Sequence, residues 1–271
     1  MADRKRADVL LVEQGLCESR ERAQAAIMEG RVYLGEKRIN KPSEQLDLED
    51  RLTLRSAVND YVSRGALKLE KAIRVFGAEL KSRVVMDIGA STGGFTDVCL
   101  RAGAKRVYSI DVGYGQLDWK LRNDPRVTVM ERTNARYLEP GMFPEKPEIT
   151  VMDVSFISIR LIIPTAISIM GDSGRIYTLI KPQFEAGREN VGKNGVVRDP
   201  AVHETVLREI LDFAEAIGWP VIRLDWSPIT GPKGNIEFIA EMRKRNEKTG
   251  AVTGERVTEL VREAHTMLPG R

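Results

Sequence analysis

The sequence is poor in the side chains that most often build disulfides, metal centres and histidine-based catalysis. Cys17 and Cys99 are its only cysteines, which excludes a disulfide framework or a zinc cluster of four thiolates. His203 and His265 are its only histidines, so a histidine-based triad or metal site is not expected. Both fall in stretches with helical periodicity, where we expect packed or solvated side chains. The sequence therefore predicts no metal centre.

Long hydrophobic runs are also absent. Residues 1–11 contain no apolar core of the length that a secretory signal needs. The most apolar helical stretch, residues 161–170, is too short to span a bilayer and is interrupted by Pro164. These two absences predict a cytoplasmic protein that does not insert into membranes.

The overall charge is close to balance. The net charge is +3 at pH 7 over 271 residues, of which 30% are charged and 42% are hydrophobic. This composition suits a folded protein with a substantial core, built as one large domain or two modest ones. A nucleic-acid partner is compatible with this charge, but it has to be inferred from local clusters of basic residues.

The stretch at residues 84–96, VVMDIGASTGGFT, has the pattern of a buried strand, a glycine-rich turn and the start of a helix. Such a unit opens a doubly wound α/β domain, in which ligands bind at the carboxyl ends of the strands. The dinucleotide fingerprint G-x-G-x-x-G is not met, because Ser91 stands at the middle glycine. Without a pyrophosphate site, S-adenosylmethionine is the leading cofactor. A plain tight turn is the alternative.

Glycines in this turn remove Cβ atoms where we expect backbone and ligand to come close. The residues assigned to the cofactor from this stretch are Asp87, Gly89, Ala90, Ser91, Gly93 and Gly94.

Two further residues at strand ends are candidates for the same cofactor. Asp111 follows the strand at residues 107–110, near the position where an acidic residue often meets ribose hydroxyls. A strand-end turn is the alternative role for Asp111. Asn134, after the strand at residues 127–130, is a candidate for the adenine edge, with an Asx turn as an equally plausible reading.

The pattern of strands and helices predicts a Rossmann-like, seven-stranded α/β domain over residues 61–271. The last two strands form a hairpin that places the seventh between antiparallel neighbours. A loop rich in glycine and charge, residues 185–198, is expected to be long and mobile over the site. The remaining strands are expected at residues 149–152, 175–180, 220–226 and 236–242.

Four ionisable residues are expected to meet at one edge of this sheet. Asp153 and Lys181 directly follow parallel strands, whose carboxyl ends border the ligand crevice. Glu237 begins a strand that runs the other way, so it starts at the same edge. Lys68 lies on a helix just before the first strand. A lysine on a helix face is normally solvated, and only these three partners argue for another role.

The first sixty residues predict a small α+β domain with helices at residues 6–15 and 19–28. Short strands follow, and alternating leucines predict one half-buried strand over residues 46–54. Residues 55–62 are polar and mark the boundary. Residues 1–41 hold nine basic and seven acidic residues, so charge alone fits a phosphate-binding edge and a mixed solvated surface equally well.

Sequence resemblance decides between those two readings. The run LLVEQGLCESRERAQAAIMEGRVYLGEKRINKPSEQL resembles the small RNA-binding module named after ribosomal protein S4. The resemblance implies binding to structured RNA. The residues assigned to RNA binding are Arg20, Arg22, Arg31, Lys37, Arg38, Lys41 and Arg64.

The larger domain resembles the FtsJ-like ribose 2′-O-methyltransferases. The matching segments are SRGALKL around Lys68, DIGASTGGF, Asp111, DVSF at Asp153, LIKPQFE at Lys181 and GNIEF at Glu237. With the N-terminal module, the whole chain resembles the TlyA family, also called haemolysin A.

The implied reaction is methyl transfer from S-adenosylmethionine to a cytidine 2′-hydroxyl in ribosomal RNA, of the small or large subunit or both. The implied catalytic residues are Lys68, Asp153, Lys181 and Glu237, with Asp153 also beside the cofactor. A free lysine is protonated at neutral pH, so we expect Lys181 to act as the base or to orient the hydroxyl.

Other functions are weakened by residues that are missing. An amino-group methyltransferase is expected to carry two prolines after the fourth strand, and residues 153–156 have none. A pyrimidine carbon-5 methyltransferase needs a nucleophilic cysteine near the site, and Cys99 is expected mid-helix. A non-catalytic RNA-binding protein is disfavoured because all four catalytic positions are filled. A membrane-active haemolysin is disfavoured because no apolar segment is long enough.

Overall fold

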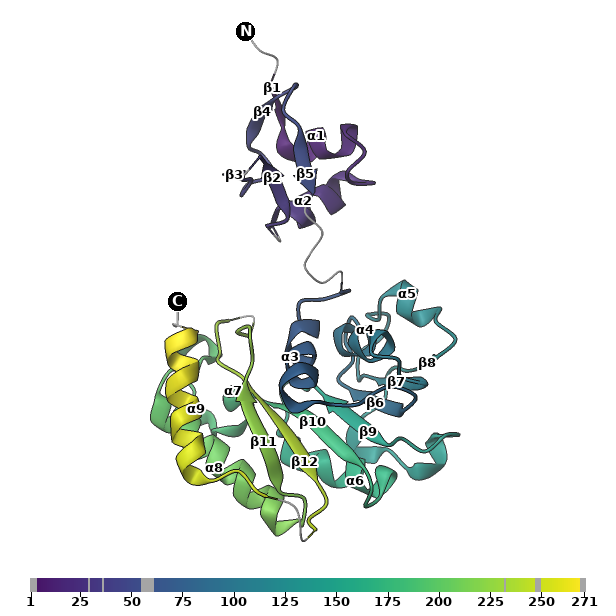
Figure 1. The fold of residues 1–271 in the computed structure, drawn as a ribbon, viewed down its shortest axis with the longest axis vertical. Helices are drawn as coiled ribbons and strands as arrows, with labels where there is room; N and C mark the ends of the chain where they lie inside the picture. The colour runs from purple at the N-terminus through teal and green to yellow at the C-terminus, as the bar shows by residue number, and fades with distance from the viewer. Residues whose placement is uncertain are drawn as a thin grey trace. The chain divides into compact units, whose positions relative to one another are not determined.

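The computed structural model describes residues 4–28, 30–35, 37–54, 61–231, 233–246 and 250–268. The chain divides into two compact units, Met1–Tyr61 and Val62–Arg271 (Figure 1). The linker expected at residues 55–62 falls mainly on residues 55–60, which lie outside the described residues, as does Glu36 of the turn expected after Gly35.

The N-terminal unit packs two helices against short strands around a small apolar core. Its core includes Leu11, Ile27 and Val32. Strand β1 pairs with β4, and a second sheet has the order β3-β2-β5. The elements are β1 (Arg4–Arg6), α1 (Ala7–Glu13), α2 (Arg20–Met28), β2 (Val32–Leu34), β3 (Lys37–Arg38), β4 (Gln45–Asp47) and β5 (Leu52–Leu54).

The single strand expected over residues 46–54 is wrong. The backbone N–H of Asp50 donates to the Asp47 carbonyl at 3.0 Å, and the Asp47 N–H donates to the Asp50 carboxylate at 2.9 Å. This tight turn separates β4 from β5, which then join different sheets. The leucines alternate on both sides of the turn, so the sequence pattern alone does not reveal the turn. Strand β1 was also not expected.

The larger unit is built on the expected seven-stranded sheet, in the order β11-β12-β10-β9-β6-β7-β8. Strand β12 runs antiparallel to both β10 and β11, while β10, β9, β6, β7 and β8 are parallel. The prediction of a Rossmann-like fold is confirmed. The strands are β6 (Val84–Ile88), β7 (Arg106–Ile110), β8 (Val127–Met130), β9 (Ile149–Met152), β10 (Arg175–Ile180), β11 (Val221–Trp226) and β12 (Phe238–Arg243).

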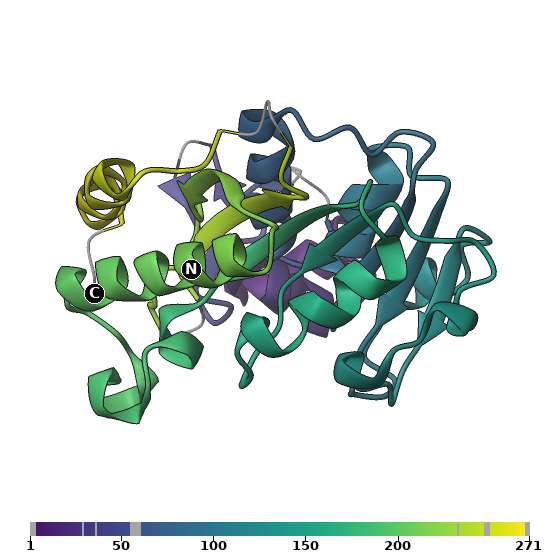
Figure 2. The ribbon, with the colours of Figure 1, turned by 90° about the horizontal axis from the view of Figure 1, so that it is seen from below.

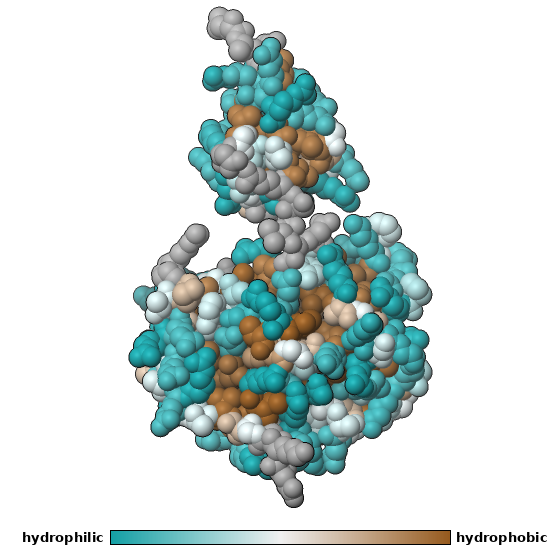
Figure 3. Space-filling model, viewed as in Figure 1, coloured by the Kyte–Doolittle hydropathy of each residue, from teal (hydrophilic) through white to brown (hydrophobic). Residues whose placement is uncertain are grey.

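Helices cover both faces of this sheet. Seen edge-on, α3 lies on one side, and α6 and α8 lie on the other (Figure 2). Apolar surface gathers around α3 and over β11 and β12, with hydrophilic residues around it (Figure 3). The helices are α3 (Ala66–Phe76), α4 (Gly94–Arg101), α5 (Trp119–Arg122), α6 (Ile163–Met170), α7 (Pro182–Glu185), α8 (Pro200–Ala216) and α9 (Gly254–Met267).

The connections after β10 contain short helical turns that the sequence did not predict. Pro182 is an expected stop for the strand at residues 175–180, and in the structure it also begins α7, since proline suits the first helical position. The glycine-rich loop that follows contains two short 3₁₀ turns, Arg188–Asn190 and Lys193–Gly195. The buried Asn235 side chain accepts from the Val197 N–H at 3.0 Å and donates to the Gly195 carbonyl at 2.9 Å. These bonds tie the end of the loop to the segment before β12.

The two histidines join α8 to α9. His203 Nδ1 and His265 Nε2 are 2.9 Å apart, which requires one proton between them. His203 is completely buried, and burial together with the His265 ring lowers its pKa to about 4, against a smaller opposing effect of Asp199. The expectation of a packed role therefore fits the geometry of both rings.

We expect this pair to make the protein acid-labile. A histidine with a folded-state pKa below its unfolded value contributes stability that is lost as the pH falls from about 6.5 towards 4. Lowering the pH from 7.5 to 5 should reduce the free energy of unfolding by on the order of 2 kcal/mol more in the native chain than in His203→Leu. Urea unfolding at both pH values measures this, and an equal loss in both chains would contradict it.

Candidate active site

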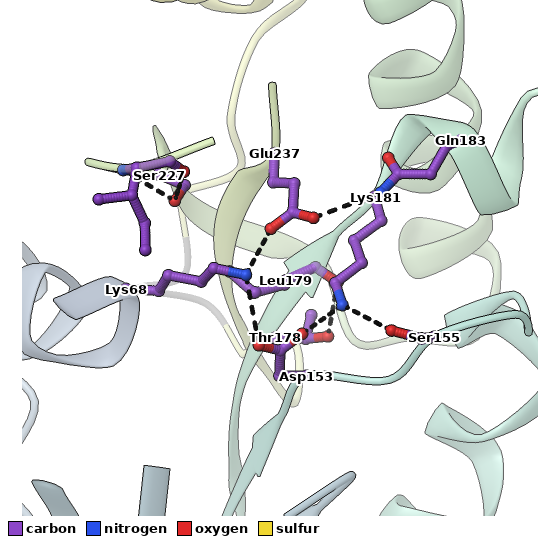
Figure 4. A network of polar contacts seen from close by, with 10 residues as sticks. Lys68, Asp153, Ser155, Thr178, Leu179, Lys181, Gln183, Ser227 and Glu237 are labelled. Carbon is purple, nitrogen blue, oxygen red and sulfur yellow. Dashed lines mark hydrogen bonds and ion pairs between the residues drawn. The ribbon is translucent and has the colours of Figure 1, made fainter. Parts of the chain in front are cut away.

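The four ionisable residues expected at the sheet edge do lie together (Figure 4). Asp153 follows β9, Lys181 follows β10, and Glu237 directly precedes β12. Because β12 runs against β10, the start of β12 lies at the carboxyl edge of its parallel neighbours, where Ile180 pairs with Phe238. Lys68 reaches the same point from α3.

The four side chains form a continuous chain of ion pairs. Lys68 Nζ lies 2.6 Å from Glu237 Oε2 and 3.4 Å from Asp153 Oδ2. Lys181 Nζ lies 2.5 Å from Asp153 Oδ1, an ion pair without hydrogen-bond geometry. Lys181 Nζ also donates to Ser155 Oγ at 3.0 Å. Asp153 therefore bridges the two lysines, and two positive charges balance two negative ones.

Burial separates this cluster from ordinary surface ion pairs. Lys68 is 6% exposed and Glu237 is 1% exposed, so a solvated helix-face role for Lys68 is wrong. Burial on its own lowers the pKa of Lys68, but the charges of Asp153 and Glu237 and their hydrogen bonds outweigh it and leave the pKa raised. Lys68 is therefore a permanent cation at neutral pH, and it fixes both carboxylates.

Gln183 and Ser155 complete the cluster and were not anticipated. Gln183 Nε2 donates to Glu237 Oε1 at 3.3 Å, on the side away from Lys68. The sequence signal available was only their closeness to Lys181 and Asp153 in the segments KPQFE and DVSF. Polar residues one or two positions beyond a strand end point into the crevice or away from it, and sequence spacing does not decide which.

The glycine turn leaves β6 close to the cluster, and three of its glycines are also required by the packing of the protein itself. A Cβ at Gly89 would lie 2.6 Å from the Asp153 carbonyl oxygen, and one at Gly94 would lie 3.0 Å from the Ala66 nitrogen. Gly93, at φ 98°, would meet the Leu121 side chain. The close approaches seen here are to the protein itself, and they bring the turn against α3 and the segment after β9.

Asp87 lies beneath this turn and is completely buried. Its Oδ2 accepts from the Thr96 hydroxyl at 2.6 Å, and Thr96 Oγ1 is also 2.7 Å from Ser109 Oγ. Burial raises the pKa of Asp87 to about 7. Its Oδ1 has no hydrogen-bond partner among the described residues. That buried, unpartnered oxygen is suited to receive a donor from a ligand.

A small pocket opens beside the turn, between the ends of β6, β7 and β8. Asp111 lies in it, and its carboxylate accepts from the N–H of Ser91 at 2.8 Å and of Gly113 at 2.7 Å. The turn role and the ligand role of Asp111 are thus compatible. The lining residues are Ala90, Ser91, Ser109, Asp111, Gly113, Gln116, Leu117, Val129 and Glu131.

Six of those lining residues were not assigned to the cofactor from the sequence: Ser109, Gly113, Gln116, Leu117, Val129 and Glu131. Glu131 carried a usable signal, because it directly follows β8 at the ligand edge. Asn134 is not among the lining residues; its Oδ1 accepts from the Arg136 N–H at 3.0 Å, which is the Asx turn held open as its alternative role.

An aromatic side chain beside the cluster was also missed. Phe156 is 91% exposed and adopts a left-handed backbone conformation, with φ 63°. Its ring lies 5.1 Å from that of Phe184, between centroids. A large apolar ring in solvent next to a buried charge cluster is the kind of surface on which a nucleic-acid base stacks.

In the N-terminal unit, several of the cations assigned to RNA already have acidic partners. Arg20 donates to the completely buried Asp8 at 3.2 Å. Arg6, then Gln24 and Arg20, hold the pKa of Asp8 well below its usual range despite its burial. Arg20 therefore stabilises the fold as well as offering charge. Ion pairs also join Arg22 to Glu18 at 2.8 Å and Lys37 to Glu44 at 2.8 Å.

The other assigned cations differ in exposure. Arg38 and Lys41 are exposed, and Arg31 is partly buried. A Cβ at Gly30 would lie 2.2 Å from the Arg38 guanidinium, so that glycine makes room for the arginine. Arg64 is exposed but belongs to the larger unit, just before α3.

Comparison with known proteins identifies both units. A family model described as FtsJ-like methyltransferase matches residues 61–244, and one described as S4 domain matches residues 5–52. The 16S/23S rRNA (cytidine-2′-O)-methyltransferase TlyA of Mycobacterium tuberculosis (strain CDC 1551 / Oshkosh) is 40% identical over 255 residues, which cover 94% of this chain and 95% of that protein. The chain belongs to the TlyA family of FtsJ-like methyltransferases.

Two further relatives of this chain agree. A Bacillus subtilis (strain 168) protein, YqxC, provisionally named as an rRNA methyltransferase, is 50% identical over 268 residues, covering 98% of this chain and 95% of that one. A solved structure from Streptococcus thermophilus whose name carries the word hemolysin is 46% identical, covers 98% of both chains and superposes with a TM-score of 0.77. The predicted family and methyltransferase class are confirmed. Across the described part of the chain, no helix combines the length and apolar character needed to cross a membrane.

Proposed function

We propose that this TlyA-family chain transfers a methyl group from S-adenosylmethionine to the ribose 2′-hydroxyl of a cytidine in ribosomal RNA, of the 16S or 23S type or both. The observation that carries the proposal is the buried cluster of Lys68, Asp153, Lys181 and Glu237 at the ligand edge of the sheet. The name of the M. tuberculosis relative specifies the same reaction.

The residues around the glycine turn fit S-adenosylmethionine. Asp111 offers a carboxylate for the ribose hydroxyls, and the pocket beside it is lined by Leu117 and Val129, which suit an adenine ring. Asp87 beneath the turn is the acceptor that we assign to the amino group of the cofactor, and this assignment is supported by an Oδ1 that has no partner among the described residues. When bound, the cofactor supplies an electrophilic methyl group on a sulfonium.

The ion-pair chain suits the acceptor side of the reaction. A ribose hydroxyl is a weak nucleophile and has to lose its proton at or before methyl transfer. Lys181 Nζ, held by Asp153 and Ser155, is the group that accepts or orients that proton. Lys68 stays charged and keeps Asp153 and Glu237 in place. Phe156 offers a stacking surface for the base of the same nucleotide.

The S4 unit supplies RNA affinity in this proposal. Its cations, with Arg64 of the larger unit, contact phosphates and give affinity without base specificity. Titrating S-adenosylmethionine by calorimetry and assaying methyl incorporation into small and large ribosomal subunits test the whole proposal. Binding of S-adenosylmethionine without methylation would leave a non-catalytic RNA-binding protein. Absence of both cofactor binding and methylation would reject the proposal outright.

Replacing Asp111 should weaken cofactor binding. We expect Asp111→Ala to raise the dissociation constant of S-adenosylmethionine by on the order of 10- to 100-fold, because charge-assisted hydrogen bonds are lost. The dissociation constant of Asp111→Asn should lie between those of Asp111→Ala and the native chain. Calorimetry measures both, with Asp124→Ala as the control, since Asp124 pairs with Arg126 and does not line the pocket. Native-like affinity in Asp111→Ala would refute the assignment.

A further inference from the structure

The segment after β9 and the segment after β10 are joined by a series of contacts. The innermost are the 2.5 Å ion pair between Asp153 and Lys181 and the 3.0 Å hydrogen bond from Lys181 to Ser155. Next outward, the rings of Phe156 and Phe184 lie 5.1 Å apart. Successive residues of one segment thus meet successive residues of the other.

The outermost contact in this series is made by Glu185, whose side chain is 2% exposed. Its Oε2 accepts from the Ser158 hydroxyl at 2.6 Å, and its Oε1 accepts from the Ile159 N–H at 2.9 Å. Arg160 Nε lies 3.8 Å from Oε2. Glu185 ends α7 and caps the 3₁₀ turn Ile159–Leu161 from outside that turn. Burying a carboxylate is unfavourable unless hydrogen bonds or an ion pair compensate for the lost contact with water.

The stretch between the inner and outer contacts is strained. Phe156 has φ 63°, a left-handed conformation that a bulky side chain rarely adopts. Its ring is largely in solvent, so burial does not hold it there. Such a conformation persists when the surrounding structure fixes the chain on both sides. Asp153 and Ser155 are fixed on one side, and Ser158 and Ile159 are fixed on the other by Glu185.

We propose that Glu185 is a positioning residue for methyl transfer: by holding Ser158 and Ile159, it fixes the segment that presents Asp153, Ser155 and Phe156 beside Lys181. The role rests on the proposed function, because that segment is where the acceptor nucleotide would sit. Glu185 touches neither of the two lysines in the ion-pair chain; its effect reaches the site through the backbone of residues 153–159.

The proposed role depends on shape and hydrogen bonds and not on charge. The glutamine side chain in a Glu185→Gln variant keeps an oxygen that accepts from the Ile159 N–H, and its amide donates to Ser158 Oγ, which can reverse its role. Glu185→Ala removes both partners and leaves the Ile159 N–H and the Ser158 hydroxyl unpaired. The strained segment is then free to relax away from Lys181.

The test compares Glu185→Ala and Glu185→Gln with the native full-length chain on ribosomal subunits. We expect Glu185→Ala to lower kcat/KM for RNA on the order of 100-fold, as a small misplacement of reacting groups does. Glu185→Gln should stay within about threefold of the native value. The affinity for S-adenosylmethionine, measured by calorimetry, should be the same in all three chains. Glu209→Ala is the matched control, because Glu209 bonds Arg160 from the exposed side.

Each other outcome overturns the role. Native-like kcat/KM in Glu185→Ala means that the segment does not need Glu185. Equal impairment of the glutamine and alanine variants means that charge is required. A parallel loss of cofactor affinity indicates a general defect in folding.

Amide hydrogen exchange across residues 155–161 gives a readout that does not need activity. Faster exchange in Glu185→Ala than in Glu185→Gln supports the positioning role, and equal exchange overturns it. If the native chain methylates no ribosomal RNA, the proposed function fails, and this measurement still decides what Glu185 does to the segment.

Discussion

Replacing Lys181 by alanine is expected to lower the rate of methyl transfer by on the order of 10²- to 10⁴-fold, the range that a positioned acid or base contributes. Lys181 Nζ is held by Asp153 at 2.5 Å and by Ser155 at 3.0 Å, at the edge of the sheet where the glycine turn follows β6. Cofactor affinity should not change, because Lys181 does not line the pocket that contains Asp111. Single-turnover methylation and calorimetry measure the two quantities separately.

A second substitution separates the two roles left open for Lys181. Arginine keeps the positive charge but does not deprotonate in proteins. If Lys181 is the base, Lys181→Arg should be as inactive as Lys181→Ala. If Lys181 orients the hydroxyl as a cation, the arginine variant should retain a measurable part of the rate. Lys193→Ala, at an exposed lysine of the following loop, is the control. Near-normal methylation by Lys181→Ala would rule out both roles.

The arrangement of the sheet was predictable because topology leaves few choices. Parallel strands bring their carboxyl ends to one edge, so Asp153 and Lys181 had to lie near each other. An antiparallel last strand then placed Glu237 at the same edge. None of these steps requires knowledge of side-chain packing. The place of the seventh strand between antiparallel neighbours and the meeting of these three residues follow from strand patterns and connection rules.

Lys68 shows where the pattern stops being sufficient. Periodicity places it on α3, but a helix presents its side chains in every direction and lysine is normally solvated. Only its three expected partners argued against a solvated role, and its catalytic role came from the resemblance to FtsJ-like enzymes. Gln183, Phe156 and Glu185 had no such guide. The place of Phe156 depends on a left-handed backbone conformation, and those of Gln183 and Glu185 depend on hydrogen bonds between distant segments; propensity and alternation encode neither.

The wrong prediction of a single strand has a physical cause. Leucine alternation over residues 46–54 suggested one strand. The turn at Asp47–Asp50 keeps the leucines at even-numbered positions, so a period of two residues cannot reveal it. The glycines after β6 show a related limit: a Cβ at Gly89 or Gly94 would meet the protein's own backbone, and the sequence did not indicate which neighbour that would be. Local sequence shows that a position needs an unusual conformation, and the neighbour that imposes it becomes visible only in the fold.

Replacing Glu237 by alanine should destabilise the protein by on the order of 3–5 kcal/mol, the cost of leaving a buried charge without its partner. Lys68 Nζ lies 2.6 Å from Glu237 Oε2, and both side chains are almost fully buried. Without Glu237, Lys68 keeps only the 3.4 Å contact with Asp153, and its buried charge loses the closer of its two partners. Urea unfolding measures the loss. Glu259→Ala, at an exposed ion pair with Arg256, should change stability by less than about 1 kcal/mol.

A compensated pair of substitutions distinguishes stability from catalysis at this site. Lys68→Met combined with Glu237→Gln removes one positive and one negative charge, and the glutamine can still bond Gln183. We expect the double variant to regain most of the stability lost in Glu237→Ala, since replacing a buried ion pair by groups of similar volume is often neutral. Its methyl transfer should remain impaired, because Asp153 is then fixed by Lys181 alone. Recovery of both properties together would show that Lys68 and Glu237 serve the fold only, and that the chemistry depends on Asp153 and Lys181.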